Sequence, residues 1–171
     1  MSNLKSSIKK VAVMVSPDVS FINEINDMDF DVFQIHKQLS IDVIKASNKK
    51  IWYAVNINDE DELKKNEEFL NTLSDNLLEK IEGIVVDAPQ FGSGKTFDWQ
   101  KSKRLKKAGT NSPPESILDK MLFVLAGGLN PGNVAEGISI FNPDVVDVSS
   151  GVEGTNGKEK ELIDAFVNAV R

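Results

Sequence analysis

Six short apolar runs, separated by segments with helical spacing, constrain the fold of this chain more than any other sequence feature. The runs are rich in β-branched residues and mostly continuous, which is typical of strands buried on both faces of a parallel sheet. They span residues 11–15, 32–35, 51–55, 83–86, 122–125 and 145–148. The chain is therefore predicted to be an α/β protein.

The segments between these runs predict helices. Apolar residues recur at helical spacing, and we expect helices at 19–28, 59–80, 99–107, 133–141 and 159–170. Residues 41–48 fit either a short helix or the start of a strand, and residues 108–116 read as a surface loop. Alternating strands and helices indicate βαβ units. Since no linker divides the sequence, we expect a single domain over residues 1–171.

Two architectures satisfy this pattern. The sequence holds about six β/α units, whereas a closed barrel needs eight and rarely runs below about 200 residues. An open, doubly wound sheet of about six strands fits the length equally well. Periodicity alone does not choose between the barrel type and the doubly wound type.

Charge and residue usage exclude several classes of function. The net charge of −6 and the sequence pI of about 4.9 argue against a nucleic-acid partner. No apolar run reaches the roughly 18 residues of a transmembrane helix. With no cysteine and one histidine, disulfides, thiolate chemistry and Cys/His-rich metal sites are excluded, and we expect a cytoplasmic location. A small phosphorylated ligand stays compatible, because one phosphate needs only a local cluster of N–H donors.

Two glycine-containing turns follow predicted strands and are candidate ligand contacts. Gly127 and Gly128 follow the fifth apolar run, and Ser149, Ser150 and Gly151 follow the sixth. Glycines let the backbone approach a ligand closely and expose its N–H groups. Glycines also serve simply to make tight turns, but two successive turns of this kind favour a phosphate site, as found after the last two strands of many barrels.

Three polar residues at strand ends are further candidates. Asp87 follows the fourth run, Asp147 lies in the sixth, and His36 follows the second. The carboxyl ends of barrel strands carry catalytic side chains, so Asp87 is a candidate general acid. Each residue also has a structural alternative: Asp87 as a turn cap, Asp147 as a hydrogen-bonding partner, and His36 as a surface residue. The two carboxyl groups would also suit a glycosidase, although the sequence does not give their separation.

Four strings, in the order that the family has them, resemble the phosphoribosylanthranilate isomerase family. Residues 125–134 read Leu-Ala-Gly-Gly-Leu-Asn-Pro-Gly-Asn-Val, and residues 147–153 read Asp-Val-Ser-Ser-Gly-Val-Glu. Residues 92–99 match the family's Gly-Ser/Thr-Gly-Lys-Thr-Phe-Asp-Trp. Residues 34–36, Gln-Ile-His, resemble its Gln-Leu-His, with Lys37 where the family has glycine. The resemblance runs from about residue 10 to residue 171.

The resemblance implies a (β/α)8 barrel that uses neither cofactor nor metal. The family converts N-(5′-phosphoribosyl)anthranilate to 1-(2-carboxyphenylamino)-1-deoxy-D-ribulose 5-phosphate, an Amadori rearrangement of tryptophan biosynthesis. An aspartic acid protonates the ribose ring oxygen, and a cysteine thiolate removes the C2′ proton. The implied residues are Asp87 as the acid, Gly127, Gly128 and Ser149 as the phosphate cradle with Ser150 and Gly151 beside it, and Asp147 and His36 as substrate contacts.

The sequence also departs from the family. Its Lys-Ile-Cys-Gly segment on strand 1 and its Ser-Pro-Arg segment after strand 2 have no counterpart here, and residues 1–9 resemble a remnant of the helix before strand 3. We therefore expect a TIM-type barrel with about six of eight units, two unpaired edges, and proton abstraction slower by about 10²–10⁴-fold. A homodimer or a complementing chain would cover the edges.

Two other functions fit the same residues. The chain would be a non-catalytic phosphosugar-binding relative if the cradle is kept without the base. It would be a different phosphosugar enzyme if Asp87 works with another base on a rearranged α/β fold.

Overall fold

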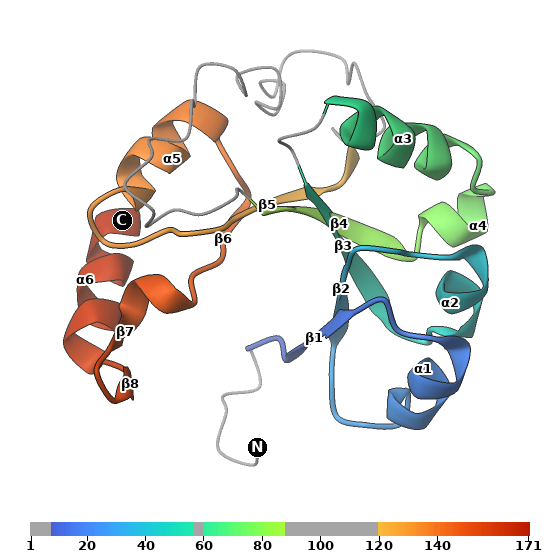
Figure 1. Ribbon diagram of the computed structural model, residues 1–171, viewed down its shortest axis with the longest axis horizontal. Helices are drawn as coiled ribbons and strands as arrows, with labels where there is room; N and C mark the ends of the chain where they lie inside the picture. The colour runs from blue at the N-terminus through green and yellow to red at the C-terminus, as the bar shows by residue number, and fades with distance from the viewer. Residues whose placement is uncertain (1–7, 57–59, 88–119) are drawn as a thin grey trace.

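The computed structural model describes residues 8–56, 60–87 and 120–171, and six parallel strands within this part form one sheet (Figure 1). Each strand pairs with the next along the chain, so the order follows the sequence. The strands are β1 (Val11–Val15), β2 (Val32–His36), β3 (Lys50–Asn56), β4 (Ile81–Asp87), β5 (Leu122–Ala126) and β6 (Val145–Val146).

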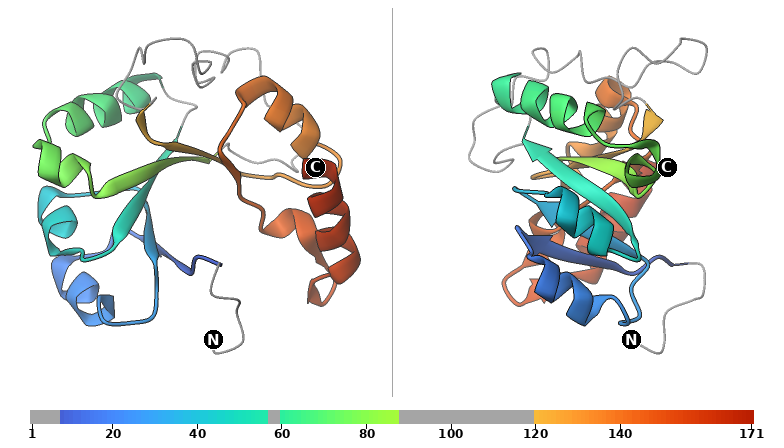
Figure 2. Two further views of the ribbon diagram at one scale, coloured as in Figure 1. Left: turned by 180° about the vertical axis from the view of Figure 1, so that it is seen from behind. Right: turned by 90° about the vertical axis from the view of Figure 1, so that its right-hand side faces the viewer.

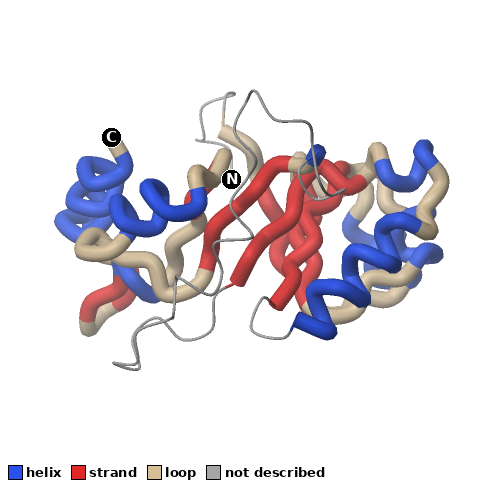
Figure 3. Tube along the Cα trace, turned by 90° about the horizontal axis from the view of Figure 1, so that it is seen from above, coloured by secondary structure: helices blue, strands red, loops and turns tan. Residues whose placement is uncertain are grey.

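The sheet is curled, and its helices form an arc along the outer face (Figure 2). They are α1 (Val19–Ile25), α2 (Ile41–Ala46), α3 (Glu60–Asn71), α4 (Asp75–Leu78), α5 (Val134–Phe141) and α6 (Lys160–Val170). Seen from above, the strands run between the two groups of helices (Figure 3). A doubly wound sheet carries helices on both faces, so that alternative is wrong. The barrel-type arrangement with six β/α units is confirmed as a curled half-barrel.

Strand alternation divides the core into two layers. Outward-facing residues such as Phe33, Ile35 and Leu125 pack against the helices in the larger cluster, where Phe123 and Phe141 meet edge to face with ring centroids 6.4 Å apart. The smaller cluster lines the inner face of the sheet and consists of Val32, Trp52, Ala54, Val85, Val124 and Ala126.

Several predicted elements differ from the structure. The single helix expected over 59–80 is wrong: α3 ends at Asn71 and α4 begins at Asp75. Thr72 donates its hydroxyl to the carbonyl of Phe69 at 2.7 Å, and hydroxyl side chains of this kind compete with helical pairing. The ambiguous segment 41–48 holds α2, whose N-cap Ser40 accepts from the backbone N–H of Val43 at 3.3 Å. The sixth strand is shorter than expected.

The hairpin of β7 (Glu153–Gly154) and β8 (Gly157–Lys158) was not predicted. Each strand has only two residues, so no alternating pattern marks it in the sequence.

Apolar positions at both ends of the arc are exposed. Phe21 of α1 and Met28, which follows that helix, are each 45% exposed, and Ile163, Val167 and Val170 of α6 are also exposed. Among the described helices, α1 packs mainly on α2, and α6 mainly on α5. A terminal helix in the arc therefore buries only part of its apolar stripe.

The inner face of the sheet also has exposed apolar side chains at β1. Val13 and Val15 lie opposite Gln34 and His36 in the parallel register. They are 63% and 59% exposed, whereas Val32, on the same face of the neighbouring strand, is buried. The end of the sheet at β1 thus presents apolar side chains without cover from the described residues.

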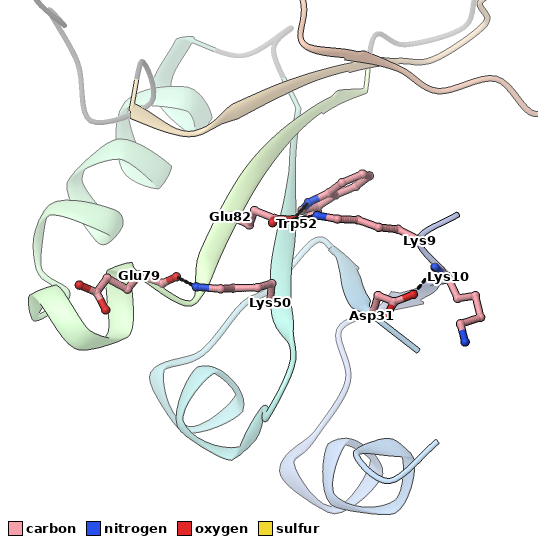
Figure 4. A network of polar contacts seen from close by, with 7 residues as sticks. All are labelled: Lys9, Lys10, Asp31, Lys50, Trp52, Glu79 and Glu82. Carbon is pink, nitrogen blue, oxygen red and sulfur yellow. Dashed lines mark hydrogen bonds and ion pairs between the residues drawn. The ribbon is translucent and has the colours of Figure 1, made fainter. Parts of the chain in front are cut away.

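A polar network joins the first and fourth strands at the amino end of the sheet (Figure 4). A register shift between Ile51 and Trp52 leaves Glu82 as an extra residue in β4. Its carboxylate accepts from Lys9 Nζ at 2.9 Å and from Trp52 Nε1 at 2.9 Å. Because Lys9 precedes β1, this ion pair spans the two intervening strands β2 and β3.

The acid sensitivity of folding tests this network. Burial raises the pKa of Glu82, but the hydrogen bonds from Lys9 and Trp52 outweigh it and hold the pKa below its ordinary value of 4.5. A carboxyl group with a depressed pKa contributes stability above its ordinary pKa and loses that contribution as the pH falls through the folded-state pKa. We expect Glu82→Gln to remove about 1 kcal/mol at neutral pH and less below pH 4.

Urea unfolding between pH 3 and pH 7 measures this difference, with Glu79→Gln, an exposed position, as the control. Equal pH dependence of wild type and Glu82→Gln would contradict the role of the network.

Candidate active site at the carboxyl edge of the sheet

Parallel pairing brings the predicted site residues to one edge of the sheet. Asp87 is the last residue of β4, and its Cα lies opposite Ala126 of β5, which directly precedes Gly127. His36 is the last residue of β2 and lies opposite Ala54. The backbone positions predicted for the acid and for the first glycine turn are therefore neighbours. The side chain of Asp87 lies outside the described part of the structure.

The turn after β5 requires its glycines. Gly127 and Gly128 have φ values of 84° and 58°, a region that side chains rarely adopt. Asn133 closes the turn, because its Nδ2 donates to the Gly128 carbonyl at 3.2 Å and its Oδ1 accepts from the Asn130 N–H at 2.8 Å. Sequence reasoning did not assign Asn133 to the site, although its spacing from Asn130 was the available signal.

A lysine of the β7–β8 hairpin holds the turn after β6. Asp147 is half-buried, and its N–H donates to the Leu125 carbonyl at 2.8 Å, which continues the sheet toward the turn. Lys158 Nζ donates to Ser149 O at 2.6 Å and to Ser149 Oγ at 3.1 Å, and it pairs with Glu153 Oε1 at 2.7 Å. Lys158 was missed from the sequence, because nothing in the unpredicted hairpin marked it as a partner of Ser149.

The two turns pack directly against each other. A Cβ atom at Gly151 would lie 1.8 Å from the carbonyl oxygen of Leu129, so only glycine fits. Ser150 and Gly151 begin the short 3-10 helix η3 (Ser150–Val152). The structure thus unites the two glycine turns that the sequence placed separately.

His36 is half-buried at the end of β2 and lies 3.0 Å, Nε2 to Nε2, from Gln34. The next residue, Lys37, has a φ of 65°, in the left-handed region. A non-glycine residue there costs roughly 1 kcal/mol, which explains physically why glycine suits this position.

Neither a metal site nor a membrane span is found among the described residues. They hold no group of three or more His, Asp or Glu side chains arranged for a metal ion. None of their helices is long and apolar enough to cross a bilayer. Some predicted features fall outside this part of the chain: the string 92–99, the helix expected at 99–107 and the loop at 108–116. Residues 1–7 also fall outside it.

A curled parallel sheet, helices on its outer face and joined glycine turns at its carboxyl edge define the (β/α)-barrel class. The family model of N-(5′phosphoribosyl)anthranilate (PRA) isomerase matches residues 2–169. The chain belongs to this family.

Individual proteins of this family are similar to the chain in sequence and in structure. The N-(5′-phosphoribosyl)anthranilate isomerase of Streptococcus gordonii is 33% identical over 167 residues, covering 97% of this chain and 73% of the relative. The enzyme of that name from Thermoanaerobacter sp. (strain X514) is 36% identical and covers 100% of this chain and 76% of the relative. The crystal structure of phosphoribosyl anthranilate isomerase from Thermotoga maritima matches with a TM-score of 0.74 and 26% identity, covering 99% of this chain and 76% of that one.

The contact between the turns can be tested by Gly151→Ala. The added methyl group would collide with the rigid backbone of Leu129, so we expect a loss of about 1–3 kcal/mol in the free energy of unfolding, measured in urea. Gly154→Ala is the matched control, because its methyl group meets only the Glu159 side chain, which can move away. Equal effects of the two substitutions would mean that the turns do not depend on their contact.

Proposed function

We propose that this chain isomerises N-(5′-phosphoribosyl)anthranilate to 1-(2-carboxyphenylamino)-1-deoxy-D-ribulose 5-phosphate, in the cytoplasm. The observation that carries the proposal is the packing of Gly151 on the Leu129 carbonyl. It joins the two family strings into one unit beside the end of β4, where the backbone of Asp87 lies. Membership of the isomerase family supports the choice of substrate.

In this proposal the joined turns hold the phosphate of the substrate. The N–H groups near Gly127, Gly128, Ser149, Ser150 and Gly151 supply donors, since compact turns of this kind bind anions through backbone amides. Lys158, whose charge is partly offset by Glu153, holds Ser149 in place through Oγ at 3.1 Å.

The chemistry begins with proton transfer in the proposed mechanism. The carboxyl group of Asp87 gives its proton to the ribose ring oxygen, and the bond from that oxygen to C1′ breaks as the aniline nitrogen supplies its electron pair. A base then removes the C2′ proton, and the resulting enolamine tautomerises to the ketone. Asp147 and His36 contact the substrate.

The base is the open part of the proposal. The 171 residues contain no cysteine, so none of them supplies the thiolate that the resemblance implies for removal of the C2′ proton. In our proposal, a side chain at the rim or a group outside these 171 residues takes that role. The runner-up function, a phosphosugar-binding relative without turnover, needs no base.

The acid role predicts that Asp87→Asn abolishes turnover of freshly made phosphoribosylanthranilate. Turnover is measured as the loss of fluorescence of this substrate. We expect a decrease of at least about 10²-fold, because an amide has no acidic proton to give. Asp42→Asn, at an exposed position of α2, is the matched control and should leave the rate unchanged. Equal turnover by Asp87→Asn would remove Asp87 from the mechanism, and ligand binding without turnover by the wild type would favour the runner-up.

We also propose that a second copy of the chain or a complementing chain covers the apolar end of the sheet. The exposed valines of β1 and the apolar stripe of α6 support this proposal, since uncovered apolar surface and strand edges favour association. A solved relative from Thermotoga maritima is described as dimeric.

Val13→Lys tests this association. The side chain is 63% exposed in the isolated chain, so the substitution should leave its fold intact. We expect the mass measured by light scattering to fall to that of one chain, because a buried lysine would oppose the contact. Lys64→Ala, on the exposed side of α3, is the control. A wild-type chain that is monomeric at all concentrations, alone and in cell extract, would contradict the proposal.

A further inference from the structure

Gln34 and His36 are two residues apart on β2, so their side chains lie on the same face of the sheet. This is the inner face, because Val32 on the same side belongs to the inner cluster. Gln34 is 4% exposed, and in the register it lies between Val13 of β1 and Trp52 of β3. A polar amide is thus held inside the half-barrel, one step below the histidine at its rim.

The contact between the two side chains bears on where the proton of the imidazole lies. Gln34 Nε2 lies 3.0 Å from His36 Nε2. An amide nitrogen only donates, and a neutral imidazole has one donor and one acceptor nitrogen. If the Gln34 amide donates in this contact, His36 Nε2 accepts, and the proton of a neutral ring then lies on Nδ1. A proton on Nε2 would set two donors against each other and leave the buried amide unsatisfied.

We propose that Gln34 is a positioning residue that holds His36 as the neutral Nδ1–H tautomer, and that this tautomer directs the imidazole donor toward an oxygen of the substrate. The tautomer follows from the contact itself, whereas the role toward substrate rests on the proposed function. A ring nitrogen whose protonation is set by a neighbour needs no tautomer change when the ligand arrives.

The chain suits a direct test, because His36 is its one histidine. In the full chain labelled with 15N-histidine, long-range 1H–15N spectra at neutral pH report both nitrogens of a single ring. We expect a protonated, pyrrole-type Nδ1 and an unprotonated, pyridine-type Nε2. A protonated Nε2, or a rapidly exchanging mixture of tautomers, would overturn the inference even without any variant.

Variants separate this role from simple packing. Gln34→Leu removes the donor, and we expect the ring to shift to a mixture of tautomers or to Nε2–H. Gln34→Glu offers an acceptor in place of the donor, so it should bring a proton to Nε2. Gln38→Leu makes the same change as the first variant at an exposed position two residues after His36, and it should leave the Nδ1–H tautomer in place. A folded Gln34→Leu or Gln34→Glu variant that keeps the wild-type tautomer would count against the role of Gln34.

Ligand binding then tests the substrate half of the inference. The probe is reduced 1-(o-carboxyphenylamino)-1-deoxyribulose 5-phosphate, which is bound in a solved structure of a phosphoribosyl anthranilate isomerase. Gln34→Leu should weaken its binding by about threefold to tenfold, the net effect of one hydrogen bond, and Gln38→Leu should not. A tautomer change without loss of affinity would overturn the role toward substrate. Failure of the wild type to bind would instead remove the proposed function, while the spectra still decide the tautomer.

Discussion

The parallel hydrogen-bonded ladder from β1 to β6 is the constraint on which the rest of the structure depends. It orients every strand alike, so all carboxyl ends meet at one edge and the candidate site gathers there. The same ladder sets the alternation that sends Phe33 and Ile35 toward the helices and Gln34 and His36 inward. Burial on the inner face differs along the curled sheet. Val124 of β5 is buried there, whereas Val13 of β1 is exposed.

Local patterns predicted most of the strands but not how they are covered. Continuous apolar runs marked all six strands, because both faces of a parallel sheet are apolar. The break between α3 and α4 was missed because Leu73 and Leu77 continue the apolar spacing across it. The exposure of Phe21 was unpredictable, since an apolar stripe does not say whether a neighbour covers it. The pairing of Lys9 with Glu82 joins residues 73 positions apart and leaves no local trace.

The candidate site was predictable in its parts rather than in its assembly. Both glycine turns were identified from strand ends followed by Gly127 and Gly151, but their contact through the Leu129 carbonyl depends on tertiary packing. The Gln34–His36 contact was within reach of the sequence, because residues i and i+2 of a strand share a face. The role of Asp87 stays a prediction, supported by its place at the end of β4.

Two residues directly after strands, Ser16 and Lys37, share an unfavourable left-handed backbone at the carboxyl edge. They lie close together, since the N–H of Gln38 donates to Ser16 Oγ at 3.3 Å. The strands that precede them hold this geometry, so local preference and overall fold disagree at these two positions. The rim thus stores backbone strain at two positions beside the candidate site, and the sheet beneath them holds that strain in place.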